Sequence, residues 1–494
     1  MTGPDTDIKD SLVKFPSTSA IHRVVKKVRP SSVPLSIGGT ELLPVENLLA
    51  AGKAMRQLVP RTAHAKWKKD ENRKDPIAIL RAGDAGRLEE LLPIRYGRML
   101  QSPFAFFRGS AAVMAADLAK TPVTGTRVQA CGDCHLMNFG GFATPERNII
   151  FDINDFDETL PAPWEWDVKR LAVSFVLAAR SINLSNEEGR DAATNAARSY
   201  RKAMRAFTRM NPLELWYHRF TAEDFVKMLP KSRQQAMQSK IDKALSQTGS
   251  EMDYPKLAGM VGGHIGIRDA PPLIFHPGLK EDSFGKMLEE VFVAYRENLG
   301  DERRILLDAF RVVDAALKVV GVGSIGWRCW IVLLMSSTNE PLFLQFKEAV
   351  ESVLEPYAGR SVYPNHGQRV VIGQRLIQPA SDIFLGWVTV PIPGSERERC
   401  YYARQLRDAR IKPLIETFDA EMLTLYGRMC GFILARAHAK TLDHCTISGY
   451  LGASDQFDEA VADFALAYAD QVERDYAALK AAVKNGKIKA FREA

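Results

Sequence analysis

The sequence predicts an α+β fold with a large helical content and two separate β-rich regions. Short runs of β-branched and aromatic residues mark residues 126–157 and 319–405 as extended. Helical spacing of Ala, Leu and Met marks most of the chain around them. The chain has 494 residues, more than one simple core needs, so we expect two or three packed units.

Composition narrows the class of protein. Hydrophobic residues make up 46% of the chain and charged residues 25%, as in ordinary globular proteins. The net charge of +7 is spread along the chain without a basic arm, so nucleic acid is not an expected partner. No apolar run reaches the roughly 18 residues that span a membrane, and Met1–Lys14 does not resemble a signal peptide. We therefore expect a cytoplasmic protein with reduced cysteines and no membrane partner.

The pattern of elements divides the chain into five segments. They are an N-terminal extension (1–85), a mixed segment (86–184), a helical insertion (185–318), a β-rich segment (319–408) and C-terminal helices (409–494). Strands are expected near 127–130, 140–144, 148–153, 327–335, 342–346, 383–390 and 400–406. The Gly/Pro-rich segment Gly259–Phe275 is expected to be a surface loop.

The first group of chemically suggestive residues lies on a loop after the first predicted strand. Asp133 and Asn138 are five residues apart on this loop, and Asp155 follows the strand near 148–153. Phosphoryl transfer needs a carboxylate to accept the proton of the attacking hydroxyl and oxygen ligands to hold Mg²⁺. The loop therefore offers the residue types that this chemistry uses.

Further acids surround Asp155. Asp152, Asp157 and Glu158 crowd the same segment, where negative charges repel each other unless a cation sits among them. A metal ion explains the cluster, and a solvated acidic turn is the alternative. Asp167, in the first turn of a predicted helix, could bind backbone N–H groups of the Asp133 loop or simply complement the helix dipole.

The second group is a glycine loop followed by a lysine. Residues 321–326 read Gly-Val-Gly-Ser-Ile-Gly, and the residues after them form a predicted strand. A dinucleotide-binding loop would lead into a helix, whereas a glycine loop between strands is typical of the lid over kinase phosphates. Lys347, after the next strand, lies where a phosphate-pairing lysine belongs. A tight hairpin and a surface lysine are the alternatives.

Together these residues resemble the kinase-like superfamily, in its aminoglycoside and choline phosphotransferase branch. The matching segments are Cys131–Asn138, Asn154–Asp157 and Asp167–Lys169. The overall chain also resembles the uncharacterised bacterial domain-of-unknown-function family 2252. The kinase-like resemblance implies ATP and Mg²⁺ as cofactors and a hydroxyl acceptor, either a small molecule or a protein. It implies Asp133 as catalytic base, Asn138, Asp155 and Asp152 as metal ligands, His135 and Asp167 as structural support, and Gly321, Gly323, Ser324, Gly326, Lys347 and Gln405 as nucleotide-binding residues.

The order of the segments differs from that of a kinase. The glycine loop follows the Asp133 loop instead of preceding it, and Tyr426–Lys440 resembles the helix that normally leads into the catalytic loop. A circular permutation of a two-lobe kinase-like fold accounts for these placements. It makes Gln405–Arg407 a hinge facing adenine. The helix predicted at 368–378 lacks a glutamate, so Glu351 or Glu355 is the expected partner of Lys347.

Other functions fit parts of the pattern. The same fold could transfer AMP, or it could bind nucleotide or a partner as a pseudokinase. Cys131–His135 matches the C-x-x-C-H haem-attachment pattern, and Cys131 with Cys134 could serve a thiol or zinc role. Arg108 could bind an anionic group near the site or be structural.

Overall fold

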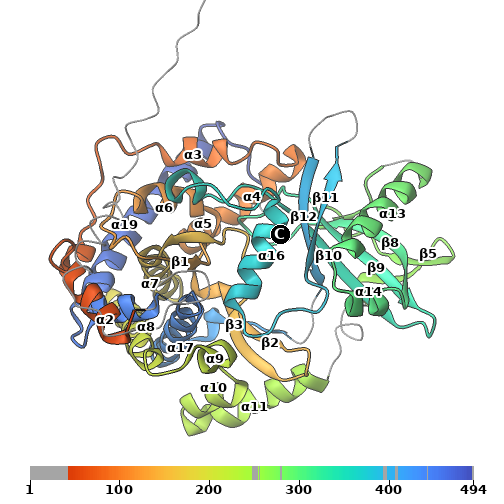
Figure 1. Cartoon of the computed structure of the whole chain (residues 1–494). Coiled ribbons are helices and arrows are strands. Elements are labelled where there is room, and N and C mark those ends of the chain that lie inside the picture. The colour runs from red at the N-terminus through yellow and green to blue at the C-terminus, as the bar shows by residue number, and fades with distance from the viewer. Residues whose placement is uncertain are drawn as a thin grey trace, which may run out of the picture.

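The computed structural model describes residues 43–246, 254, 256–278, 281–392, 398–406, 410–441 and 443–491. The predicted segment Met1–Lys14 and residue Arg407 of the predicted hinge lie outside these residues. In Figure 1 the helices gather on one side and the larger sheet on the other, with α16 (His366–Ile377) between them.

Four long helices form the centre of the helical part: α7 (Trp164–Ser181), α8 (Asn186–Phe207), α17 (Ala420–Ala439) and α19 (Gln456–Lys484). Helix α7 is buried without interruption from its start to Ala179. A helix that is buried all round belongs to the middle of a core. Helix α8 begins with a capping box, in which Ser185 and Glu188 satisfy each other's backbone N–H groups.

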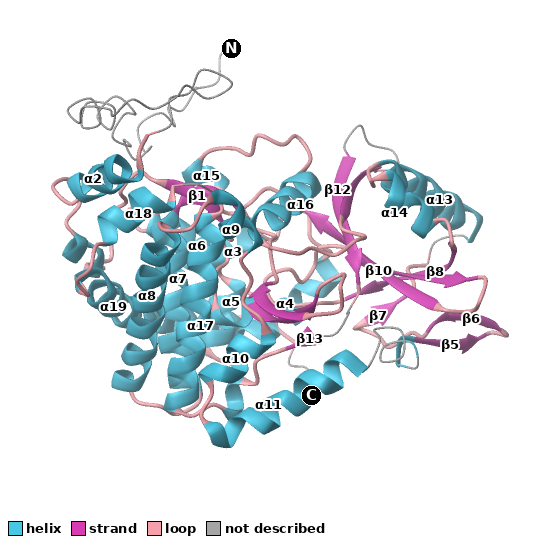
Figure 2. Cartoon of the chain, turned by 60° about the horizontal axis from the view of Figure 1, so that its bottom comes forward, coloured by secondary structure: helices cyan, strands magenta, loops and turns pink. Residues whose placement is uncertain are grey.

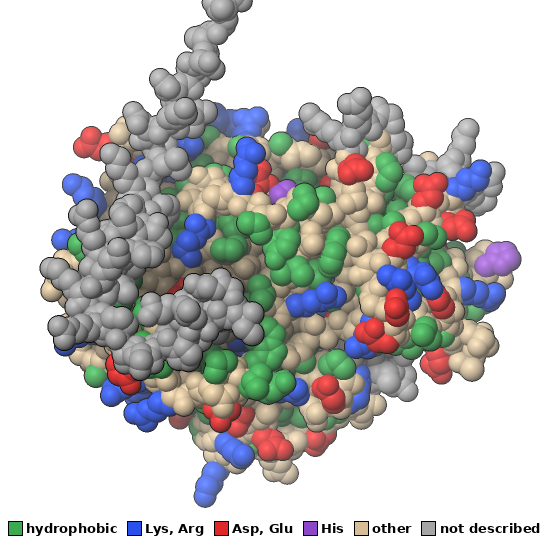
Figure 3. All heavy atoms as spheres, viewed as in Figure 1, with side chains coloured by type: hydrophobic (Ala, Val, Ile, Leu, Met, Phe, Trp, Pro, Cys, Tyr) green, Lys and Arg blue, Asp and Glu red, His purple; other side chains and the backbone are tan. Residues whose placement is uncertain are grey.

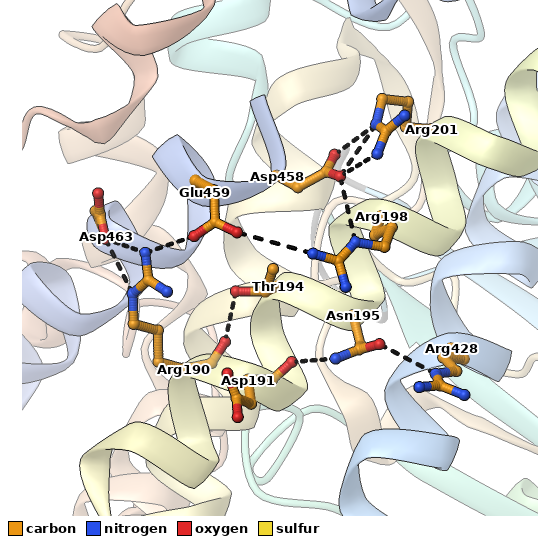
Figure 4. Close-up of polar contacts among 10 residues, drawn as sticks. All are labelled: Arg190, Asp191, Thr194, Asn195, Arg198, Arg201, Arg428, Asp458, Glu459 and Asp463. Carbon is orange, nitrogen blue, oxygen red and sulfur yellow. Dashed lines mark hydrogen bonds and ion pairs between the residues drawn. The ribbon is translucent and has the colours of Figure 1, made fainter. Parts of the chain in front are cut away.

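Ion pairs join α8 to α19 across this core (Figure 4). Arg201 donates to Asp458 at 2.6 Å, and the Asp458 side chain is completely buried. About three turns earlier on α8, Arg190 contacts Glu459 at 2.7 Å and Asp463 at 2.8 Å. A buried charge is tolerated only when it is paired, so these contacts fix the relative positions of the two helices.

The larger sheet is antiparallel and has the strand order β11-β12-β10-β9-β8-β7. Its strands are β7 (Ile274–Phe275), β8 (Phe310–Lys318), β9 (Cys329–Ser336), β10 (Pro341–Ala349), β11 (Gly386–Pro391) and β12 (Glu398–Gln405). Helix α13 (Glu281–Glu297) packs on one face through Tyr295, which contacts Phe346. The strands β5 (Ala258–Val261) and β6 (His264–Ile267) form a hairpin. Apolar residues of this hairpin pack with Ile331 and Phe343 of the sheet in a second, smaller hydrophobic cluster.

Two smaller sheets lie in the helical part (Figure 2). One pairs β1 (Arg127–Ala130) with β4 (Leu160–Pro163), and the other has the order β13-β2-β3. Its strands are β2 (Phe139–Ala143), β3 (Ile149–Ile153) and β13 (Arg410–Ile411). The loop from β1 to β2 and the segment after β3 carry the acids that the sequence singled out.

The other elements complete the helical part and the margins of the sheet. They are α2 (Val45–Met55), η1 (Arg61–Ala65), α3 (Pro76–Ala82), η2 (Glu89–Leu91), α4 (Leu92–Met99), α5 (Pro103–Gly109), α6 (Ala111–Leu118), η3 (Leu136–Asn138), α9 (Pro212–Tyr217), α10 (Ala222–Met228), α11 (Lys231–Ser246), α14 (Asp301–Leu307), α15 (Glu355–Ala358), η4 (Ile415–Thr417) and α18 (His444–Leu451).

The predicted α+β class is confirmed, and two expectations about strands are wrong. Residues 259–275 contain the strands β5 to β7 instead of forming a loop throughout. Strand β8, at Phe310–Lys318, lies in the segment that was expected to be a helical insertion. The Gly262-Gly263 pair, with φ of 56° and 89°, is the turn of the β5–β6 hairpin. A Gly-Gly pair between short apolar runs is a hairpin signal, so this feature was readable from the sequence.

The surface of the sheet part carries interspersed charges of both signs, on the right of Figure 3. They include Arg296 with Asp308 at 2.6 Å and Arg304 with Asp301 at 3.1 Å. Among the described residues, no helix combines the length and the apolar character that crossing a bilayer requires.

Helices α8 and α17 approach so closely at Gly431 that a Cβ there would lie 2.0 Å from the carbonyl oxygen of Ala196. We expect Gly431→Ala to destabilise the protein by about 1–3 kcal/mol, because the backbones must separate. Gly285, in exposed α13, has no atom within 4 Å of its Cβ position. Gly285→Ala is the matched control and should stabilise by about 1 kcal/mol. Urea unfolding measures both, and equal effects would contradict the packing described.

Candidate functional site

The Asp133 loop is held by a carboxylate beneath it. Asp167, in the first turn of α7, accepts the backbone N–H of Cys131 at 2.7 Å and that of Gly132 at 3.0 Å. Gly132 has φ of 85°, a conformation that glycine adopts without strain. His438 of α17 contacts the same carboxylate at 3.2 Å, and Tyr200 bonds the other ring nitrogen of His438 at 2.8 Å. Asp167 therefore has the bracing position that the sequence predicted.

Asp133 itself faces an arginine. Arg170, one turn after Asp167 on α7, donates Nε to Asp133 Oδ1 at 2.7 Å. The same guanidinium donates to the carbonyl of Phe107 at 3.0 Å, which fixes its orientation. His135 is buried, with Nε2 3.8 Å from Asp133 Oδ2. Burial lowers the pKa of His135 to about 3, so its ring is neutral near pH 7.

Asn138 and Asp155 line the same cavity, and each has a side-chain oxygen atom. Asn138 donates its amide N–H to the carbonyl of Asp133 at 2.8 Å, which leaves the amide oxygen for another ligand. Its backbone carbonyl accepts the N–H of Asn154 at 2.9 Å, so Asp155 is held beside this loop. An amide and a carboxylate oxygen are suitable ligands for Mg²⁺, and these two residues fit the ion that the resemblance implies.

Lys347 lies next to Asp157 rather than next to a glutamate. Its ammonium forms an ion pair with Asp157 Oδ2, and Tyr402 donates its hydroxyl to Oδ1 at 2.8 Å. Burial disfavours both charges, but the pair outweighs it: the pKa of Lys347 is raised and that of Asp157 is lowered. Among the described residues no cation forms an ion pair with Asp155, and burial together with the nearby Asp157 charge raises its pKa.

The glycine loop joins two antiparallel strands, β8 and β9. The sequence predicted the strand after the loop, whereas β8, before the loop, lies in the segment that was expected to be a helical insertion. Gly321 and Gly326 have φ of 77° and 93°. The turn rests on the helical part: Arg98 donates to the carbonyl of Gly321 at 2.8 Å, and Leu88 donates its backbone N–H to Gly326 at 2.8 Å. A Cβ on Gly323 would lie 3.3 Å from the carbonyl of Arg108. These contacts bring the loop against the helices that flank Asp133.

One cavity of about 220 Å³ is lined by both groups of residues. Its lining includes Asp133, His135, Asn138 and Asp155 from the first group and Gly321, Gly323 and Ser324 from the second. These groups are separated by roughly two hundred residues in sequence. Gly326 and Lys347 are not among the lining residues, although their neighbours Trp327 and Glu348 are.

Two predicted residues lie elsewhere. Gln405 lines a different cavity, of about 540 Å³, beside Asn154 and Arg404. Asp152 is fully buried; Arg436 donates to both of its carboxylate oxygens at 2.7 Å, and the backbone N–H of Ile153 donates to Oδ1 at 2.8 Å. The prediction of Asp152 as a metal ligand is therefore corrected: Arg436 occupies the carboxylate.

The expected glutamate partner of Lys347 is also corrected. Glu355 accepts backbone N–H groups of Ser352 and Ser361, at 3.1 Å each. Glu351 lines the cavity. In the sequence Asp157 is only one acid of a cluster, and no pattern marks Arg170 as the partner of Asp133. Nothing local in the sequence identifies either as an ion-pair partner, because both pairings join segments that only the fold brings together.

The cysteines of the loop are buried. Cys131, Cys134 and Asp167 offer atoms that lie within 4.8 Å of one another. A hydrogen bond between the thiols and their burial raise the pKa of Cys131, and burial raises that of Cys134 to about 11. Asp167 is already bound to the loop backbone, so this cluster fits a packed thiol pair better than a zinc site.

The assignment of Asp152 to an ion pair makes a prediction about stability. Asp152→Asn leaves Arg436 charged and buried without its partner, which should destabilise the protein by about 3–5 kcal/mol. Denaturant unfolding measures this loss, and Arg436→Met in the same chain should restore part of it. A stable Asp152→Asn protein with weakened metal binding would instead support the original assignment.

The raised pKa of Asp155 makes a prediction about pH. A carboxyl group whose pKa is higher in the folded state costs stability when it ionises. Asp155→Asn should therefore raise the metal-free melting temperature near neutral pH, and the gain should vanish below about pH 4, where the unfolded carboxyl is also protonated. Thermal unfolding across this range measures it. A lower melting temperature at pH 7 would contradict the assignment.

Comparisons with known proteins place the chain in a family. Neither the curated proteins nor the solved structures gave a match. A family model described as an uncharacterized protein conserved in bacteria (DUF2252) matches residues 87–482. This match covers the Asp133 loop, the glycine loop and α17, and it extends over most of the 494 residues. The chain therefore belongs to the DUF2252 family.

Proposed function

We propose that the protein is an ATP- and Mg²⁺-dependent phosphotransferase that acts on a hydroxyl acceptor. The observation that carries this proposal is the cavity in which Asp133, Asn138 and Asp155 meet the turn Gly321–Ser324. A proton acceptor, oxygen ligands for a divalent cation and a glycine turn are the parts that phosphoryl transfer needs in one place. A scaffold without this chemistry has no need for that combination.

A kinase-like fold with permuted chain order is supported by contacts around the Asp133 loop. Tyr426 of α17 donates its hydroxyl to the carbonyls of Leu136, at 3.1 Å, and Phe139, at 2.9 Å. Arg436 and His438 of the same helix bind Asp152 and Asp167. The helix that resembles the one before a kinase catalytic loop is thus in contact with that loop, although it comes almost three hundred residues later.

The residues would divide the reaction as follows. Asp133 accepts the proton of the acceptor hydroxyl as its oxygen attacks the γ-phosphorus of ATP, and ADP leaves. Arg170 orients Asp133 for this step through its hydrogen bond at 2.7 Å. Asn138 and Asp155 would hold Mg²⁺, which neutralises phosphate charge when bound. The glycine turn lets backbone approach the phosphates without a side chain in the way.

The proposal predicts nucleotide binding that depends on a metal ion. We expect Mg²⁺-ATP to raise the melting temperature more than ATP or Mg²⁺ alone, because a ligand of the folded state stabilises it by about 2.7 kcal/mol at a hundredfold excess over Kd. Asp155→Asn should abolish the metal-dependent part. Asp301→Asn, at a side chain that is 91% exposed, is the control and should leave it unchanged.

Labelled nucleotide then distinguishes the reactions. With γ-labelled ATP and a pool of small hydroxyl compounds and proteins, label should move to an acceptor and the transfer should fail in Asp133→Asn. Transfer from α-labelled ATP instead would identify an AMP transferase on the same fold. Binding without transfer of either label would indicate a pseudokinase, and the absence of any shift at millimolar Mg²⁺-ATP would contradict the proposal.

A further inference from the structure

Arg108, near the end of α5, lines the cavity that contains Asp133 and Asp155. Its Nε atom is buried and has no hydrogen-bond partner. Across the part of the chain that the structure describes, no hydrogen bond or ion pair reaches its guanidinium, and its one recorded ring contact is Phe104, 6.0 Å away. The carboxylates of Asp133, Glu416 and Asp155 interact electrostatically with Arg108, but none of them is bonded to it. A half-buried cation whose N–H groups are unpaired is costly, so its presence beside a cavity points to a ligand.

Neighbouring arginines are already engaged. Arg87 donates to the carbonyls of Gly83 and Ile325. Arg95 contacts Asp84 at 2.8 Å, and Arg170 contacts Asp133 at 2.7 Å. Arg108 differs from these three in having its five N–H donors uncommitted.

His135 lies on the same wall and is 4% exposed. Its Nε2 atom faces the carboxylate of Asp133 at 3.8 Å, so the one N–H of the neutral ring is favoured on Nε2 and Nδ1 is not a donor. The arginine that holds Asp133 also binds Phe107, the residue before Arg108. The unpaired donors of Arg108 are therefore fixed next to the proposed base.

We propose that Arg108 binds an oxyanion, a phosphate or a carboxylate, carried by the acceptor substrate. This inference rests on the proposed function and names its substrate class: a hydroxyl compound with an anionic group. A guanidinium binds such a group through two parallel hydrogen bonds, which would orient the acceptor so that its hydroxyl lies at Asp133. The nucleotide would bind at the glycine turn and Asp155, which line the same cavity.

The smallest probes of this subsite are inorganic phosphate and acetate. Each is titrated into the protein at constant ionic strength, in the presence of Mg²⁺ and a non-hydrolysable ATP analogue, and the melting temperature is followed. At least one anion should raise it, and comparison of the two tells phosphate from carboxylate. Arg108→Gln should lower the affinity for that anion at least tenfold, and Arg108→Lys should retain part of it.

Two controls assign the site. Arg428→Gln changes a distant arginine, whose guanidinium contacts Asn195, and should behave as wild type (Figure 4). The same titration without the ATP analogue is the second control and should keep the anion response. Circular dichroism and the unliganded melting temperature show whether Arg108→Gln is folded, and Arg108→Lys serves if it is not.

The outcomes separate this inference from the proposed function. A response to the ATP analogue that Arg108→Gln retains, together with loss of the anion response, supports both. An anion response that is absent in wild type, or unchanged in both Arg108 variants, overturns the oxyanion subsite while nucleotide binding stands. An Arg108-dependent anion response without any nucleotide response keeps the subsite and removes the phosphotransferase.

Discussion

The ion pair of Lys347 with Asp157 is the contact on which the site depends. Lys347 belongs to the larger sheet and is 4% exposed, whereas Asp157 follows β3 in the helical part. Neither charge can be buried alone at an acceptable cost, so the pair sets how the sheet lies against the helical part. Arg369 of α16 strengthens the same junction by donating to the carbonyls of Asp157, at 2.8 Å, and Thr159, at 2.7 Å.

Because the two parts are joined in this way, the two groups of residues line one cavity although they are far apart in the sequence. The glycine turn reaches the helices around Asp133 because β8 ends and β9 begins at the level of Lys347, which is paired with Cys329, the first residue of β9. Asp155 is buried in the same segment beside the charge of Asp157, and both effects raise its pKa although Lys347 and Arg404 act in the opposite direction. A buried carboxylate whose ionisation costs stability in the metal-free protein is a feature of a binding site for a divalent cation.

Much of the local structure was predictable from the sequence. The strand, loop and strand around Asp133, the strand that follows the glycine turn and the bracing position of Asp167 all follow from residue patterns within short windows. Asp152 shows where such reasoning fails. It lies within β3 and points to Arg436, whereas Asp155 lies beyond the strand end. The two acids are three residues apart and look alike in sequence, so only the packing of α17 separates their roles. The partners of Lys347 and Asp133 were missed for the same reason.

The central claim is that one nucleotide site is built from segments that the chain order separates. The most direct measurement is a crystal structure of the protein with Mn²⁺ and a non-hydrolysable ATP analogue, with anomalous scattering locating the metal. The account predicts Mn²⁺ at Asn138 and Asp155, with the phosphates against Gly321, Gly323 and Ser324. Nucleotide bound only in the cavity at Gln405, or Mn²⁺ bound away from Asp155, would contradict it.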